Sequence, residues 1–195
     1  MFPRRRKIIL FLFFLAFLPA IASSQISFIQ NKGQWPGHVK YKSEIPGGSF
    51  WIQSNGFAYQ LFDSTIFIPD HKPNVLPDST VTLFFLQQLE NASLNLAEEQ
   101  DDLPGYFNYY LGSDSTKWSS HVKRFQNINF QNVYDGINLR LLGKSKSIKY
   151  QFELQPHANP NQISWHYHDS LQLVLDTSGN LTTHHALGRI YESRP

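Results

Sequence analysis

Residues 103–154 read LPGYFNYYLGSDSTKWSSHVKRFQNINFQNVYDGINLRLLGKSKSIKYQFEL, and this stretch decides the fold. In its second half, apolar and polar residues alternate over 137–141 and again over 148–154, with the turn residues 143–146 between them. Successive side chains of a strand point to opposite faces of a sheet. The pattern therefore predicts antiparallel strands with one buried face and one face in water. No segment of the chain keeps the 3.6-residue period of an amphipathic helix.

Earlier segments predict more of the same structure. Val39–Ile45, Ser49–Gln53 and Phe57–Phe62 form a β-meander in this interpretation, because Asn55-Gly56 is a strong hairpin signal. Residues 80–89, TVTLFFLQQL, predict a strand that is buried on both faces or central in the sheet.

Two irregular segments complete the interpretation of the chain. The acidic residues 98–102 predict a solvated loop, and Ser115 is a candidate N-cap for a short helical turn that leads to Trp118. We therefore expect a mainly β, antiparallel, sandwich-like domain with short helical turns.

Length and composition restrict the classes of protein. A chain of 195 residues suits one domain, and a domain of this size buries about two-thirds of the surface that its unfolded chain exposes. The sequence contains no cysteine, which excludes disulfides, thiol catalysis and zinc–thiolate sites.

Residues 1–22 have the pattern of a cleavable secretory signal. A basic segment over 3–7 precedes the apolar run Ile8–Leu18, and Ala20-Ile21-Ala22 supplies the small residues of a cleavage site. The alternative is a retained membrane anchor, but the apolar run is about half of the roughly 20 residues that span a bilayer. We expect a mature domain over 23–195 that is secreted or held at the cell surface.

Charge gives no sign of nucleic-acid binding. Four of the 17 basic residues lie in the expected signal segment, so 13 remain against 15 acidic residues. The mature chain is then slightly acidic, without the basic surface that nucleic-acid binding requires.

An aromatic cluster in the first half of the opening stretch is the candidate binding site. It consists of Tyr106, Tyr109, Tyr110 and Trp118, together with Phe107. Exposed rings of this kind stack on sugar faces or anchor a partner protein. Aromatic side chains are more often buried, and we expect most of these rings to pack in the core. Since adjacent residues of a strand point in opposite directions, one of Tyr109 and Tyr110 is expected to be exposed.

Catalytic and metal chemistry find little support. His166 and His168 share one strand face and could ligate a metal with His184 or His185, but a polar outer strand face is the favoured explanation. The sequence has no G-x-S-x-G elbow, P-loop or G-x-G-x-x-G segment, and nothing places two carboxylates in a cleft. We predict no enzyme activity, no cofactor and no metal.

Several landmarks occur in an order that resembles a known family. These landmarks are FIQNKGQWP (28–36), VKYKSEIPG (39–47), NGF (55–57), LPGYFN (103–108), GSDSTKWSSHV (112–122), VYDGINLRLL (133–142), KYQF (149–152), GNL (179–181) and LG (187–188). Together they resemble a domain of unknown function at the N-terminus of large secreted proteins of Bacteroidetes-type bacteria. In those proteins the domain commonly precedes β-propeller repeats, PKD-like or immunoglobulin-like modules, and a gliding-motility or type IX sorting domain.

The resemblance implies a structural or interaction role and no catalytic activity. It implies a non-catalytic module of a multidomain surface or adhesion-type protein, whose partners are neighbouring modules. The alternative is a carbohydrate-binding module that uses exposed aromatic rings on a surface glycan. We expect the chain to be the N-terminal module of a longer protein, with a truncated paralogue as the other explanation. In either case, residues 103–122 are the part in which we expect a binding function.

Overall fold

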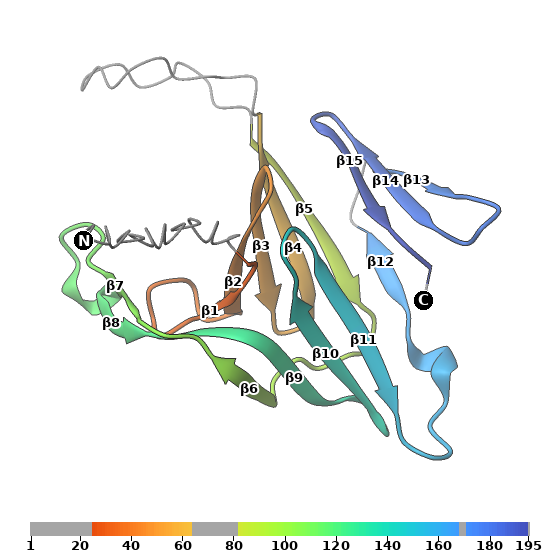
Figure 1. The fold of residues 1–195 in the computed structure, drawn as a ribbon, viewed down its shortest axis with the longest axis horizontal. Helices are drawn as coiled ribbons and strands as arrows, with labels where there is room; N and C mark the ends of the chain where they lie inside the picture. The colour runs from red at the N-terminus through yellow and green to blue at the C-terminus, as the bar shows by residue number, and fades with distance from the viewer. Residues whose placement is uncertain (1–24, 64–81, 168–170, 195) are drawn as a thin grey trace, which may run out of the picture.

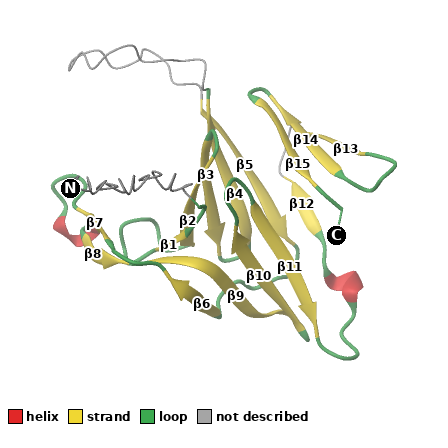
Figure 2. Cartoon of the chain, viewed as in Figure 1, coloured by secondary structure: helices red, strands yellow, loops and turns green. Residues whose placement is uncertain are grey.

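The computed structural model describes residues 25–63, 82–167 and 171–194. The expected signal segment, residues 1–22, lies outside these ranges. The described chain is mainly β and antiparallel, and its helical parts are the 3₁₀ turns η1 (Ser115–Lys117) and η2 (Pro160–Gln162) (Figure 2).

One large sheet of ten strands forms the body of the domain. Nine strands follow each other in the order β11-β10-β9-β1-β2-β3-β4-β5-β12, and β6 pairs with β9. These strands are β1 (Phe28–Gln30), β2 (Val39–Ile45), β3 (Gly48–Gln53), β4 (Gly56–Phe62), β5 (Thr82–Leu89), β6 (Ala97–Asp102), β9 (Arg124–Tyr134), β10 (Ile137–Gly143), β11 (Ile148–Leu154) and β12 (Trp165–Tyr167).

Two small antiparallel units flank the large sheet. One is a hairpin of β7 (Phe107–Tyr109) and β8 (Ser119–Val122). The other is a C-terminal sheet of β13 (Gln172–Leu175), β14 (Leu181–His185) and β15 (Gly188–Glu192). Figure 1 shows these two units on opposite sides of the body of the domain.

The alternating pattern of the opening stretch is confirmed in β10. Ile137, Leu139 and Leu141 are fully buried, whereas the residues between them are half-buried. Leu139 lies opposite Phe130 of β9, and Leu141 lies opposite Ile128. Because side chains alternate between the two faces along each strand, the apolar residues of both strands lie on one inner face.

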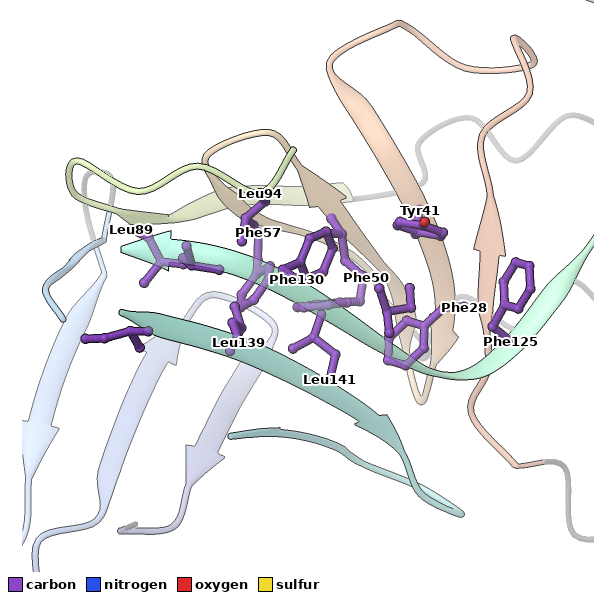
Figure 3. Close-up of a cluster of buried hydrophobic side chains, with 14 of the residues drawn as sticks. Phe28, Tyr41, Phe50, Phe57, Leu89, Leu94, Phe125, Phe130, Leu139 and Leu141 are labelled. Atoms are coloured by element: carbon purple, nitrogen blue, oxygen red, sulfur yellow. The ribbon is translucent and has the colours of Figure 1, made fainter. Parts of the chain in front are cut away.

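The sheet curls so that its two halves share one core. Inner-face residues of β1–β5 meet those of β9 and β10, and Figure 3 shows Phe50, Phe57 and Phe130 close together between the strands. Full burial of one such side chain contributes about 1.5–3 kcal/mol. This cluster is the main source of stability of the body, and its two opposed walls give the sandwich-like character expected from the sequence.

Aromatic contacts join the two ends of the curled sheet. The Trp165 ring of β12 lies 5.5 Å from the Tyr150 ring and 6.1 Å from the Phe152 ring of β11, measured between centroids. Within the described ranges, β11 and β12 share no ladder of backbone hydrogen bonds. Side-chain packing therefore closes this seam.

The structure corrects the sequence predictions for β5 and β6. β5 lies within the large sheet between β4 and β12, as one of its two alternatives predicted, but it is not buried on both faces, because Phe85, Gln87 and Leu89 are buried while Phe84 is exposed. The acidic residues 98–102 are not a loop but most of β6, which pairs with β9. The backbone of β6 completes the ladder of β9, and its acidic side chains remain in water.

The predicted helical turn after residue 114 exists, but Asp114 caps it and Ser115 does not. The Asp114 carboxylate accepts hydrogen bonds from the backbone N–H of Thr116, at 3.1 Å, and from the Thr116 hydroxyl. Both bonds favour the charged form of the carboxylate and lower the pKa of Asp114.

Candidate functional site

The candidate aromatic residues lie in the β7–β8 hairpin and the segment that enters it. We call residues 106–122 the aromatic hairpin. Tyr106, Tyr110 and Trp118 are 56%, 60% and 46% exposed. The expectation of core packing was therefore wrong for Tyr106 and Trp118, whereas the exposure of one of Tyr109 and Tyr110 was predicted. Tyr109 is half-buried, and the opposite orientation predicted for Tyr109 and Tyr110 is consistent with this difference.

Local interactions hold the exposed rings in fixed positions. The indole Nε1 of Trp118 donates a hydrogen bond to the backbone oxygen of Gly112 at 3.2 Å. Gly112 has a φ of +69°, a conformation that residues with a side chain rarely adopt. The Tyr110 ring then meets the Trp118 ring edge to face, with 5.7 Å between centroids and 76° between planes.

Tyr106 belongs to a separate part of the same hairpin. Its ring stacks on the His121 imidazole with 4.4 Å between centroids and an angle of 29°. The backbone N–H of His121 donates to the side-chain oxygen of Asn108 at 3.0 Å, which fixes the strand below the two rings.

The buried side of the hairpin is anchored on the large sheet. The Tyr109 ring packs against Trp35 at 5.5 Å, and Trp35 in turn packs against Trp51 of β3 at 5.4 Å. Burial raises the pKa of the Tyr109 hydroxyl. The Ser119 hydroxyl donates to the backbone oxygen of Lys32 at 3.1 Å. These contacts connect the exposed rings to a rigid scaffold.

A second cluster of polar side chains joins the C-terminal sheet to the large sheet. Glu192 of β15 accepts hydrogen bonds from the hydroxyls of Tyr150, at 2.7 Å, and Tyr167, at 2.8 Å. The buried Gln87 donates through Nε2 to the Tyr167 oxygen at 2.7 Å, and its Oε1 accepts from the Tyr59 hydroxyl at 3.2 Å. We call these five residues the tyrosine–glutamate network.

Burial and the charge of Glu192 together raise the pKa values of the tyrosines in this network. Burial is the main cause for Tyr59, Tyr150 and Tyr167, and the nearby carboxylate adds to it. The sequence analysis missed this network. Its members come from strands far apart in the chain, and no spacing pattern links them.

The histidine candidates do not form a metal site in the described part of the chain. There, no three His, Cys, Asp or Glu side chains come close enough to hold one ion. His184 is exposed and His185 is half-buried on neighbouring positions of β14, and His168 lies outside the described residues. Burial lowers the pKa of His185, with the nearby His184 as the second cause.

The described residues also include no helix with the length and apolarity needed to span a bilayer.

Fold and surface together define a small antiparallel β domain that presents fixed aromatic side chains. The chain belongs to a family described as a domain of unknown function, DUF7948, whose model matches residues 28–195. Comparison with curated proteins and with solved structures gave no significant match.

Proposed function

We propose that this domain is a non-catalytic interaction module of an exported, multidomain surface protein. In this proposal the module binds a partner protein through the aromatic hairpin. The carrying observation is the exposure of Tyr110 and Trp118 in a unit whose other side is anchored on the sheet. Tyrosine and tryptophan are the residues most often found as energetic anchors of protein interfaces.

The fixed geometry of the rings supports a binding role. An anchor that is already held in place loses little conformational freedom when a partner binds, so more of its contact energy contributes to affinity. The hydrogen bond from Trp118 to Gly112 and the edge-to-face contact with Tyr110 provide this restraint. Neighbouring modules of the same or an associated surface protein are the partners that we propose.

A carbohydrate ligand is the second candidate, because two aromatic rings are exposed beside polar side chains. The flat faces of a polysaccharide chain stack best on aromatic rings that lie in one plane. The planes of Tyr110 and Trp118 are 76° apart, so both rings cannot lie flat against one extended sugar chain. This geometry favours an uneven protein surface over a glycan.

Binding of the purified domain to cells of the producing organism tests the proposal. Cells are treated with protease or with periodate before binding is measured by flow cytometry. We expect wild-type binding to be lost after protease and retained after periodate, and to fall at least tenfold with Tyr110→Ser combined with Trp118→Ala. Tyr191→Ser is the matched control, because Tyr191 is 62% exposed in the C-terminal sheet, away from the hairpin.

Two results would contradict this proposal. Unchanged binding by the hairpin variant would show that the rings are not the contact surface. Loss of binding after periodate, with retention after protease, would establish the carbohydrate alternative. Circular dichroism of each variant checks that it is folded, which we expect because the altered side chains are exposed.

A further inference from the structure

A pocket of about 380 Å³ lies between the large sheet and the C-terminal sheet. Its volume is within the range of small-ligand sites, about 300–1,000 Å³. Three connections border it, namely the β2–β3 turn, the β10–β11 turn and the β14–β15 turn. No residue of the aromatic hairpin lines the pocket. Figure 1 shows the hairpin and the C-terminal sheet on opposite sides of the body.

The pocket has a mixed lining, in which apolar side chains lie beside the polar side chains of Lys146, Ser147, His185, Arg189 and Glu192. Phe50, Phe57 and Leu141 belong to the buried core and form part of its lining. Ile190 and Glu192 occupy alternate positions of β15, and both are half-buried. Glu192 is thus the one acidic residue among the described residues that line the pocket, and its carboxylate is held in place by Tyr150 and Tyr167.

The directions of the hydrogen bonds determine what a ligand must supply. A phenol has one proton to donate, and an ionised carboxylate has none. Tyr150 and Tyr167 donate their protons to the two oxygens of Glu192, and Tyr59 donates its proton to Gln87. Since burial raises the pKa values of these tyrosines, they keep those protons at neutral pH. The network therefore presents only acceptors to the pocket, and a ligand must bring the donors.

The Glu192 carboxylate and the rings beside it favour a cationic donor. The faces of the Phe50, Tyr59 and Tyr150 rings are electron-rich and attract cations. An anionic group would meet the Glu192 carboxylate, and the donor that it could find in the buried lining is Nε2 of His185, which has no hydrogen-bond partner among the described residues. Lys146 and Arg189 also border the pocket, but both are exposed at its solvent side, where water screens them.

We propose that this pocket binds a primary ammonium group carried on an apolar stem, with Glu192 as the anchoring carboxylate. The stem occupies the space beside Phe50, Phe57 and Leu141. The ammonium donates to the remaining lone pairs of Glu192 and lies against the surrounding rings. Two sources supply this chemistry, a free alkylamine or the lysine side chain of a partner polypeptide.

Titration with three probes of equal length tests the proposal. Hexylammonium, hexanol and hexanoate differ only in the head group, and Trp165 next to Tyr150 provides a fluorescence signal near the pocket. We expect saturable binding of hexylammonium, at least tenfold weaker binding of hexanol and no binding of hexanoate at neutral pH. A short blocked peptide with one lysine, compared with the same peptide carrying norleucine, distinguishes a polypeptide source from a free amine.

Variants connect binding to the carboxylate. Glu192→Gln is expected to weaken hexylammonium binding at least tenfold. Glu153→Gln is the matched control, because Glu153 is a carboxylate of β11 that does not line the pocket, and we expect it to bind like wild type. Ile148 lines the pocket and is not a member of the network, so Ile148→Trp is expected to fill the pocket and abolish binding even if Glu192→Gln fails to fold.

Three results would overturn the proposal. The first is equal binding of hexanoate and hexylammonium. The second is wild-type affinity in a folded Glu192→Gln variant, and the third is wild-type affinity in a folded Ile148→Trp variant. The aromatic-hairpin variants are expected to bind hexylammonium normally, so the outcome here is separate from that for the proposed function.

Discussion

Removal of a single hydroxyl group from the tyrosine–glutamate network should weaken the attachment of the C-terminal sheet and lower the free energy of unfolding. The hydrogen bonds of each tyrosine predict which removal costs more. In Tyr150→Phe, one hydrogen bond to a charged acceptor is lost while Glu192 keeps its bond from Tyr167. Such bonds contribute about 1.5–3 kcal/mol. Because Tyr150 and Glu192 are only half-buried, we take the lower limit, about 1.5 kcal/mol of unfolding free energy.

Tyr167→Phe should cost more than Tyr150→Phe. The Tyr167 oxygen also accepts from Nε2 of Gln87, whose side chain is 1% exposed. Without that oxygen, a buried donor loses its partner, which adds about 1–3 kcal/mol. We therefore expect a total of about 3 kcal/mol, and the melting temperature should fall by roughly 6–12 °C, compared with 3–6 °C for Tyr150→Phe.

Urea unfolding followed by tryptophan fluorescence measures these changes at pH 7. Tyr191→Phe is the control, because the exposed Tyr191 lies in the same strand as Glu192 and is expected to shift stability by less than about 0.5 kcal/mol. The double variant should show a coupling energy, since both hydroxyls bind one carboxylate. If Tyr150→Phe costs more than Tyr167→Phe, or both match Tyr191→Phe, our account of the network is wrong.

Four further outcomes follow from the fold and the pKa shifts. Phe130→Ala removes a fully buried ring from the core and should lower the unfolding free energy by about 3–5 kcal/mol, measured by urea titration. Gly56→Ala should cost at least about 2 kcal/mol in the same titration, because φ at Gly56 is +152° and the new Cβ would lie 2.5 Å from a backbone oxygen of β5; an unchanged midpoint would contradict this. The pKa values of Tyr41 and Tyr59 are raised above 10.0, so the folded state keeps protons that the unfolded state loses, and stability should fall as pH rises beyond 10 in thermal melts. The pKa of His185 is lowered below 6.5, so the unfolded state takes up a proton at a higher pH than the folded state. Thermal melts should therefore show that stability declines as the pH falls below 6.5, and that His185→Gln removes this decline.

Local patterns were sufficient to predict most of the strands. The Asn55-Gly56 turn and the alternation over 137–154 each depend on neighbours in the sequence, and the structure places hairpins at both. The prediction failed at β6, where the polar sequence AEEQDD gives no strand signal. That strand exists because the long edge of β9 provides backbone partners, and such an edge is visible only once the sheet is assembled.

The two candidate sites also differ in how far the sequence could predict them. Aromatic composition identified the cluster around Tyr110 and Trp118, but composition alone favours burial and gave the wrong environment for Tyr106 and Trp118. Their exposure follows from the position of the hairpin, which stands apart from the body and packs on it through the half-buried Tyr109 and the buried Ser119 and Val122. Glu192 could not have been found from spacing, because its partners Tyr150 and Tyr167 lie 42 and 25 residues away in the chain.

The side-chain junction between the C-terminal sheet and the large sheet has a mechanical consequence. The first described strand, β1, lies inside the large sheet between β9 and β2, so pulling on it must break backbone hydrogen bonds on both sides. The last strand, β15, is tied to the body by side chains such as Glu192, and no backbone ladder joins their described residues. Tension between the two ends of the domain would therefore detach the C-terminal sheet first, and the curled sheet would keep its shape under forces that had already extended the chain.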